Sequence, residues 1–345
     1  MLEAGSETAA ARAVAAIPSP ALGVPPSLHA SLMARLDRLG SPAKELSQIG
    51  AAIGREFTHP LLAAVVHKPE AELRTTLGRL ISAGLLLRQG SAPYATYFFK
   101  HALVRDVAYS TLLREPRRAL HARIAETLER QFPEISENQP ELLARHWTEA
   151  GQIEKSAALW GKAGLRSAQR SALVEAAEQL RRALDQTATL TATPALRREE
   201  IKLQVALITP LLHVSGYATP ETRAAVERAR LLIEQAEALG EPPEDPLLLF
   251  SVLYGSWAAK IVAFNSDVMR ELAVQFLAVA DKQRAKGPLM IGHRLMGLSL
   301  LHTGDIAGGE CILIAHSRST ILPSIVLWRR VLAKTSARQP YAGGR

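Results

Sequence analysis

Apolar residues recur at three- and four-residue intervals along most of this chain, a period typical of helices that bury one face. Between residues 27 and 83 the period predicts four helices, and Gly and Pro residues separate them. In the last of these helices Leu73, Leu77 and Leu80 share one face and are expected to be buried, with Arg74 and Arg79 exposed. The predicted bounds are Ser27–Leu39, Pro42–Ile53, Pro60–Val66 and Glu70–Ala83.

The pattern changes to a β-hairpin after Gly84. Leu85–Arg88 and Tyr94–Lys100 flank a turn around Gly90, and three helices followed by such a hairpin predict a winged helix. Two further helices are expected next. The first carries Leu103, Val107, Leu112 and Leu113 on one side, and the second carries Leu120, Ile124 and Leu128.

From Pro140 onward only helical patterns remain. ELLARHWTEAG and IEKSAALWGKAG predict an antiparallel pair with Gly151 at the turn. Small residues alternate there with the bulky Trp160, as in tetratricopeptide-like packing, but the strict 34-residue consensus is not met. We therefore expect degenerate repeats that form a right-handed α-solenoid. The small residues are Ala144, Ala157, Ala163 and Ala176, and the later predicted helices are Ser171–Asp185, Pro194–His213, Pro220–Leu239, Pro246–Phe264, Ser266–Lys286 and Pro288–Leu301.

The predicted fold class is therefore mainly α, with a winged helix and its small β-hairpin followed by a tetratricopeptide-like α-solenoid. Residues 1–26 are rich in Ala, Ser and Pro and are expected to be a linker. Residues 27–132 are expected to hold the winged-helix module and the helices that follow it. Residues 140–310 are expected to hold the degenerate repeats.

Composition supports a globular chain, with 48% hydrophobic and 21% charged residues among 345. The net charge of +8 does not by itself indicate nucleic-acid binding, because six basic residues and no acid lie between Cys311 and Arg345. Removing those six leaves +2 for the first 310 residues. The single cysteine excludes an internal disulfide and fits a cytoplasmic location.

Neither a signal peptide nor a membrane span is predicted. Glu3 and Glu7 stand where a signal peptide would carry positive charge. The most apolar run, Leu247–Ala259, is followed by Lys260 and is shorter than the roughly 20 residues that cross a bilayer. A buried core helix is the better interpretation.

Candidate chemistry is sparse along the chain. His101 and His121 lie on consecutive predicted helices, but no H-x-x-x-H pair or carboxylate cluster accompanies them, so no metal site is predicted. His101 is expected to cap or bridge the strand-to-helix junction, and His146 is expected to be structural. The chain contains no P-loop motif and no nucleophile elbow. We therefore expect no catalytic and no cofactor-binding residues.

A nucleic-acid surface is the main alternative, since winged helices often place a helix in a DNA groove. The possible contacts are Lys68, Arg74, Arg79 and Arg88. Against this, Glu70 and Glu72 begin the candidate helix, where base contacts are usually made. Three more basic residues, Arg114, Arg117 and Arg118, are interpreted as complementing the dipole at the C-terminal end of a helix.

Three segments carry a resemblance to a known family. They are GAAIGREF at residues 50–57, KPEAELRTTLGRLISAGLLL at residues 68–87 and YFFKHALVRDVAYSTLLREPRRALHARIAETLER at residues 97–130. Together they resemble the C-terminal region of bacterial class III adenylate or guanylate cyclases with an AAA or signal-transduction ATPase module. The resemblance covers residues ~20–310, and nothing in the chain resembles the cyclase domain or the nucleotide-binding core.

The resemblance implies a regulatory and protein-interaction fragment of a multidomain signalling protein. Cyclic-AMP synthesis, ATP and Mg would belong to the intact parent, whose cyclase and P-loop domains have no match here. The expected partners are another protein or the parent's own ATPase and cyclase domains, with neither nucleic acid nor membrane. The alternative function is a DNA-binding transcriptional regulator with a helical-repeat sensor.

The last segment, residues 311–345, does not continue the helical period. Its apolar residues are clumped, and Pro323 interrupts them. Codons can be chosen for Ala315–Arg338 so that a frame shifted by two nucleotides encodes about TFALYDPAEHRPLATRFGQDVR, which resembles the family's continuation. We therefore expect an out-of-frame tail that does not extend the repeats beyond Glu310, with at most a short helix around Ile325–Leu332.

Overall fold

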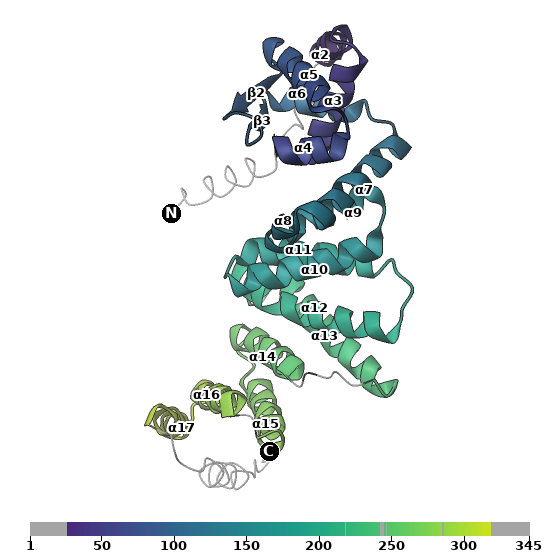
Figure 1. The fold of residues 1–345 in the computed structure, drawn as a ribbon. Coiled ribbons are helices and arrows are strands. Elements are labelled where there is room, and N and C mark those ends of the chain that lie inside the picture. Colours follow the sequence, from purple (N-terminus) through teal and green to yellow (C-terminus); the bar gives the residue numbers. More distant parts are fainter. Residues whose placement is uncertain (1–25, 218, 242–244, 246, 285, 319–345) are drawn as a thin grey trace, which may run out of the picture. The chain divides into compact units, whose positions relative to one another are not determined.

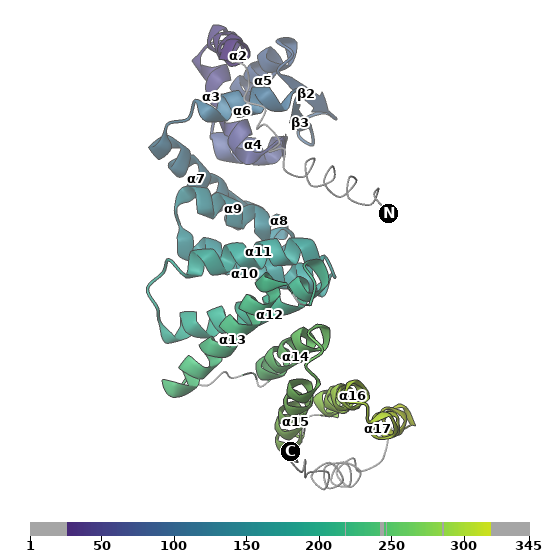
Figure 2. The same cartoon turned by 180° about the vertical axis from the view of Figure 1, so that it is seen from behind.

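The computed structural model describes residues 26–217, 219–241, 245, 247–284 and 286–318. These residues are mainly α-helical with one small three-stranded sheet, as the predicted fold class requires. They divide into two compact units, shown from opposite sides in Figures 1 and 2. The N-terminal unit comprises the residues up to Asn138 together with Arg145–Gln152, and the second unit comprises Gln139–Ala144 and the residues from Ile153 onward.

The N-terminal unit contains every helix and strand predicted between residues 27 and 132. It also contains strand β1 and helix α8, which the sequence did not predict. Strand β1 is only three residues long, and Phe57 is its single buried residue. This is too short for an alternating pattern that would predict a strand. Helix α8 has no buried residue, so it carries no apolar period. The elements are α2 (Pro26–Arg38), α3 (Ser41–Ile53), β1 (Glu56–Thr58), α4 (His59–Val66), α5 (Glu70–Ser82), β2 (Leu86–Gln89), β3 (Thr96–Phe99), α6 (Ala102–Ser110), α7 (Arg114–Gln131) and α8 (Pro133–Asn138).

The sheet is antiparallel in the order β1–β3–β2, and the predicted hairpin is its β2–β3 pair. On the other side of β3, Phe57 stands opposite Tyr97, with ring centroids 5.8 Å apart. Helix α3 approaches this aromatic layer through Gly50, where an added Cβ would lie 2.7 Å from the Phe57 ring. A glycine is therefore needed at position 50 for α3 to pack on the sheet.

Helix α5 has the faces that the sequence predicts. Leu73, Leu77 and Leu80 are buried at 1%, 2% and 0% exposure, whereas Arg74 and Arg79 are exposed. The helix ends where Gly84 takes a φ of 67°, and the next amide, that of Leu85, donates to the carbonyl of Leu80. This turn directs the chain into β2.

The second unit is entirely helical in its described part. Three of its helices begin at a side chain that accepts a hydrogen bond from the first turn: Thr193, Thr219 and Asn265. The helices are α9 (Pro140–Ala150), of which only the first residues belong to this unit, then α10 (Ile153–Gln169), α11 (Leu173–Thr187), α12 (Pro194–Val214), α13 (Pro220–Ala238), α14 (Leu247–Val262), α15 (Ser266–Lys282), α16 (Lys286–His302) and α17 (Ile306–Arg318).

Helices adjacent in the sequence pack against one another in this unit, as both views show for α10 with α11 and for α12 with α13. Helices two apart also touch, α10 with α12 and α12 with α14. Glycines permit the closest crossings: an added Cβ would lie 2.6 Å from Leu180 at Gly164 and 2.7 Å from Leu277 at Gly292. The small residues and Trp160 singled out in the sequence are all buried, at 6% exposure or less.

The prediction that the repeats stop at Glu310 is wrong for residues 311–318. Helix α17 continues through them and packs on α16, with Ile312 only 4% exposed. Gly297 of α16 lies beside Leu313 of α17. Because the glycine has no side chain, it leaves room for the clustered apolar residues of α17. Residues 319–345, including the short helix expected around Ile325–Leu332, lie outside the described residues, and the out-of-frame origin stays a prediction.

Candidate functional site

Two of the four predicted nucleic-acid contacts are held by carboxylates. The Lys68 ammonium lies 2.8 Å from Glu45 and 3.3 Å from Glu72. Hydrogen bonding to Glu45, against a smaller opposing effect of burial, raises the pKa of Lys68. Arg74 pairs with Glu70 at 3.5 Å, although 72% of its side chain is exposed.

The other two predicted contacts, Arg79 and Arg88, are exposed and have no ion pair within the described part of the chain. Arg88 on β2 and Arg74 on α5 both act electrostatically on the Tyr97 hydroxyl. Burial raises the pKa of Tyr97, while the two arginines oppose that rise and Glu70 adds to it. The basic side chains are thus interspersed with acids rather than gathered into one positive surface.

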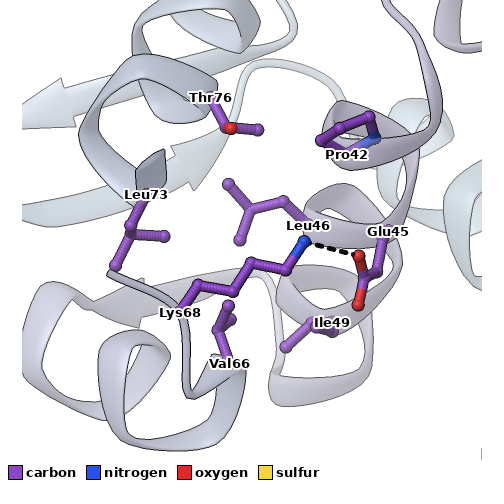
Figure 3. Close-up of a pocket in the computed structure, with 8 residues that line it drawn as sticks. All are labelled: Pro42, Glu45, Leu46, Ile49, Val66, Lys68, Leu73 and Thr76. Atoms are coloured by element: carbon purple, nitrogen blue, oxygen red, sulfur yellow. Dashed lines mark hydrogen bonds and ion pairs between the residues drawn. The ribbon is translucent and has the colours of Figure 1, made fainter. Parts of the chain in front are cut away.

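Figure 3 shows a pocket beside Lys68, whose side chain reaches across Leu46 toward Glu45. The pocket has room for about one water molecule. Small-molecule sites in proteins span roughly 300–1,000 Å³, so this pocket is too small to be one. Its lining residues are Pro42, Glu45, Leu46, Ile49, Val66, Lys68, Leu73 and Thr76.

The cluster Arg114, Arg117 and Arg118 lies in the first five residues of α7. The prediction that it complements the C-terminal end of a helix is therefore wrong, because the chain turns between α6 and α7 earlier than the apolar pattern suggested. Positive charge is unfavourable at a helix N-terminus. Arg118 lies 3.7 Å from Glu115, and the Arg117 guanidinium stacks 5.6 Å from the centre of the Tyr109 ring.

His101 occupies the N-cap position of α6, as expected from its place between strand and helix. Its side chain makes no capping hydrogen bond, and the residue is exposed. The prediction that the His101 imidazole caps the helix is therefore wrong. The extended backbone of His101 begins the helix without a hydrogen bond from the ring.

The most unusual polar site of the N-terminal unit is a chain of hydrogen bonds through Tyr109, His121, His146 and Glu149, here called the histidine network. The Nδ1 atoms of His121 and His146 lie 2.9 Å apart, and both rings are buried, at 2% and 0% exposure. His121 Nε2 is 2.9 Å from the Tyr109 hydroxyl, which donates to Glu149 at 3.3 Å. Helices α6, α7 and α9 each supply part of the network.

One assignment of protons satisfies every hydrogen bond in the network. His146 Nδ1–H donates to His121 Nδ1, His121 Nε2–H donates to the Tyr109 oxygen, and the Tyr109 hydroxyl donates to the Glu149 carboxylate. His146 Nε2 then carries no hydrogen, and this nitrogen is buried without a hydrogen-bond partner. If the hydrogen bonds ran in the reverse direction, His146 Nε2 would carry a hydrogen and form a buried N–H without an acceptor. A buried N–H without an acceptor costs more free energy than a buried nitrogen without a donor. We therefore assign the first direction.

Neighbouring contacts hold the same part of α9 in place. Arg145 donates to the carbonyl of Ile53 at 2.9 Å, and Trp147 Nε1 donates to Glu129 at 3.0 Å. Consecutive residues 145, 146 and 147 thus each make a buried or half-buried polar contact within the N-terminal unit.

Burial shifts the titration of this site. It lowers the pKa of His121 to about 4, although Glu149 opposes the shift. Burial also holds the pKa of His146 well below its usual value, and the charges of His121 and Arg145 add to that effect. Burial raises the pKa of Tyr109, and Glu149 raises it further.

The sequence carries a partial signal for this site. His121 falls on the apolar stripe of α7 with Ile124 and Leu128, and His146 falls on that of α9 with Leu143 and Ala150. The helical period therefore places both rings inside. It does not show that they meet, since 25 residues separate them.

Within the described residues no group of three or more His, Cys, Asp or Glu side chains is placed to hold a metal ion. Among the helices of the described part, none is long and apolar enough to cross a membrane.

Comparison with known proteins gives one relative and one structural neighbour. No family model matches the chain. The chain is 26% identical over 254 residues to an uncharacterised protein of Rhizobium meliloti (strain 1021), a match that covers 73% of this chain and 24% of that protein. The chain therefore spans about a quarter of the length of this relative.

The structural neighbour is the crystal structure of a Signal Transduction ATPase with Numerous Domains protein with a tetratricopeptide repeat sensor, from Pyrococcus horikoshii. The TM-score is 0.37 and the sequence identity 13%, over 87% of this chain and 46% of the neighbour.

Proposed function

We propose that this chain is a regulatory, protein-interaction region of a multidomain signalling ATPase. The observation that carries the proposal is the architecture of the second unit. Sequence-adjacent helices pack one on the next through small residues and bury a core that runs from Ile201 to Ile312. Stacked helical pairs of this kind present extended surfaces that bind peptides or other domains.

The N-terminal unit is proposed to be a winged helix that packs on a protein domain. Its elements follow the order α3–β1–α4–α5–β2–β3, in which the β2–β3 hairpin is the wing. Two observations favour a protein partner over DNA at α5: Glu70 and Glu72 occupy its first turn, and Lys68 is neutralised by two carboxylates. A DNA-reading helix needs free positive charge against the phosphates.

The parent of this region is proposed to be a class III adenylate cyclase with an ATPase module, on the strength of the resemblance over residues ~20–310. In that parent ATP and Mg would bind outside this chain, and the winged helix would transmit the nucleotide state of the ATPase. The chain itself is proposed to be non-catalytic and cytoplasmic.

A test of this proposal starts from the DNA upstream of the Met1 codon. We expect it to encode a P-loop ATPase, and we expect that module, expressed separately, to form a complex with the full chain in size-exclusion chromatography with light scattering. A variant with Glu70 and Glu72 changed to Lys should weaken the complex if α5 contacts the module. An upstream region without a P-loop, or an ATPase module that elutes apart from the chain, would contradict the proposal.

The second candidate, a DNA-binding regulator, is favoured by one observation. Arg79 and Arg88 are exposed and lack a carboxylate partner within the described part of the chain. Fluorescence anisotropy with a mixed-sequence DNA duplex distinguishes the two functions, because only the regulator would bind with a steep dependence on salt.

A further inference from the structure

The histidine network has no free place for an additional proton. His121 Nε2 and His146 Nδ1 already carry hydrogens that they donate. A proton on His121 Nδ1 would set two N–H groups against each other across 2.9 Å. A proton on His146 Nε2 would create a buried N–H with no acceptor. Each way of charging either ring therefore breaks a hydrogen bond or leaves a donor unsatisfied.

The surroundings offer little compensation for a charged ring. Burial opposes the charged form, as do the guanidinium groups of Arg117 on α7 and Arg145 on α9. Arg105 on α6 acts in turn on Arg145. Among the residues that the structure describes, Glu149 is the carboxylate that favours a charged His121, and it is linked to that ring through Tyr109. Helix α3, which packs on α6 and α7, adds no charged group to this set.

We propose that the histidine network is an acid-sensitive lock, which holds residues 145–151 against α6 and α7 while both rings are neutral and releases them when either ring is protonated. Two of the other side-chain contacts of the segment are polar, whereas its Trp147 and Ala150 side chains are also buried, at 2% and 7% exposure. Arg145 binds a backbone carbonyl and Trp147 a carboxylate, both of which water can replace once the segment opens.

The direction of the pH effect follows from the lowered pKa values. A histidine exposed to water once the segment opens has a pKa near ~6.5, whereas burial lowers the pKa of His121 in the closed network to about 4. The lock is therefore fully effective above ~6.5 and weakens as the pH falls from there toward ~4. Each ring that charges on opening changes the opening equilibrium about tenfold per pH unit, and two rings change it about a hundredfold.

Hydrogen–deuterium exchange of the full chain between pH 7.5 and 5 tests the lock, with rates corrected for the intrinsic pH dependence of amide exchange. We expect protection of the amides of residues 145–151 to fall by about tenfold or more per pH unit below ~6.5. The amides of Leu77–Leu80, in α5 of the same unit, serve as the internal reference. Parallel profiles for the two segments would overturn the proposal.

Variants assign the effect to the two rings. In His121→Asn with His146→Asn, the amides can replace the Nδ1 hydrogen bond without titrating, so the profile of residues 145–151 should become as flat as that of α5. The control His213→Asn changes an exposed ring of the second unit and should leave the profile unchanged. A double variant that keeps the acid-dependent opening would contradict the lock.

Glu149→Gln gives an independent test if the double variant does not fold. The amide oxygen still accepts from Tyr109, but the negative charge that supports a protonated His121 is gone. The closed network then tolerates a charged His121 even less, so protection of residues 145–151 should fall in acid at least as far as in the parent. A smaller acid-dependent loss of protection than in the parent would show that the network does not govern the opening.

Discussion

At the scale of single residues, buried polar side chains make hydrogen bonds that the helical pattern does not predict. Ser299 is 0% exposed, donates to the carbonyl of Leu295 at 2.7 Å and accepts from Trp257 Nε1 at 2.9 Å. The hydroxyl thus satisfies an indole N–H that the packing of α14 against α15 and α16 has taken out of water. The helical period alone shows that both residues are inside, but not that they pair.

Ser299→Ala should destabilise the second unit by about 1–3 kcal/mol, because the Trp257 N–H would be buried without an acceptor. Urea unfolding followed by circular dichroism measures the change. The matched control is Ser251→Ala, since Ser251 also donates to the carbonyl four residues earlier but has no second hydrogen-bond partner among the described residues. The control should stay within ~0.5 kcal/mol of the parent. Equal losses in the two variants would show that the Trp257 hydrogen bond contributes nothing.

At the scale of elements, α5 shows how charge placement separates two uses of one helix. Its buried face is an ordinary leucine stripe, whereas its exposed face mixes Glu70 and Glu72 with Arg74 and Arg79. Glu70 pairs with Arg74 on the same helix, and Glu72 pairs with Lys68, which stands just before the helix. Such a face matches a protein surface with mixed charges better than a phosphate backbone.

Charge reversal at Arg74 and Arg79 should therefore leave DNA binding unchanged, since no binding is expected at micromolar protein and physiological salt. Anisotropy titrations with the parent and with the Arg74→Glu, Arg79→Glu double variant measure this. Removing the acids instead, by Glu70→Gln with Glu72→Gln, should raise non-specific affinity at low salt. Tight parent binding that the double reversal abolishes would favour the regulator and reject a purely protein-binding α5.

At the scale of the whole chain, the position of α17 changes the expectation for truncation. The sequence predicted that residues 311–345 do not extend the repeats, but Ile312 and Leu313 pack on α16. Deleting residues 311–345 should therefore lower the melting temperature, because removing a buried Ile costs about 2–5 kcal/mol. Deleting residues 319–345 keeps every contact described for α17 and should leave the melting temperature unchanged. Thermal melts of the two truncations and the parent measure the difference, and an unchanged melt for the longer deletion would contradict the packing of α17.

The whole chain is also expected to lack a nucleotide site. It carries no P-loop motif, and the pocket beside Lys68 has room for only about one water molecule. Isothermal titration calorimetry with Mg-ATP should show no saturable heat at micromolar nucleotide. Saturable binding would mean that this chain forms a nucleotide site without a P-loop motif, and it would contradict the proposed division between this region and an ATPase parent.

The sequence by itself determined the helices and their faces. In an α-helix, burial is set by residues three and four positions apart, so the stripe Leu73, Leu77 and Leu80 and the small residues around Trp160 were visible without any tertiary contact. The β2–β3 hairpin was equally local, because its turn signals and alternation lie within a few residues. The fold class followed from these short-range patterns.

Tertiary structure alone decided which residues meet. Strand β1 is part of a sheet only because Phe57 pairs with Tyr97, 40 residues away in the sequence. Lys68 likewise forms an ion pair with Glu45 on α3. The contact between His121 and His146 arises in the same way, from packing of helices distant in sequence. Periodicity specifies which face of a helix is buried, but not the neighbour that covers it or the angle at which the two helices cross. For that reason the sequence placed both histidines inside the protein, and only the fold joined them into one network.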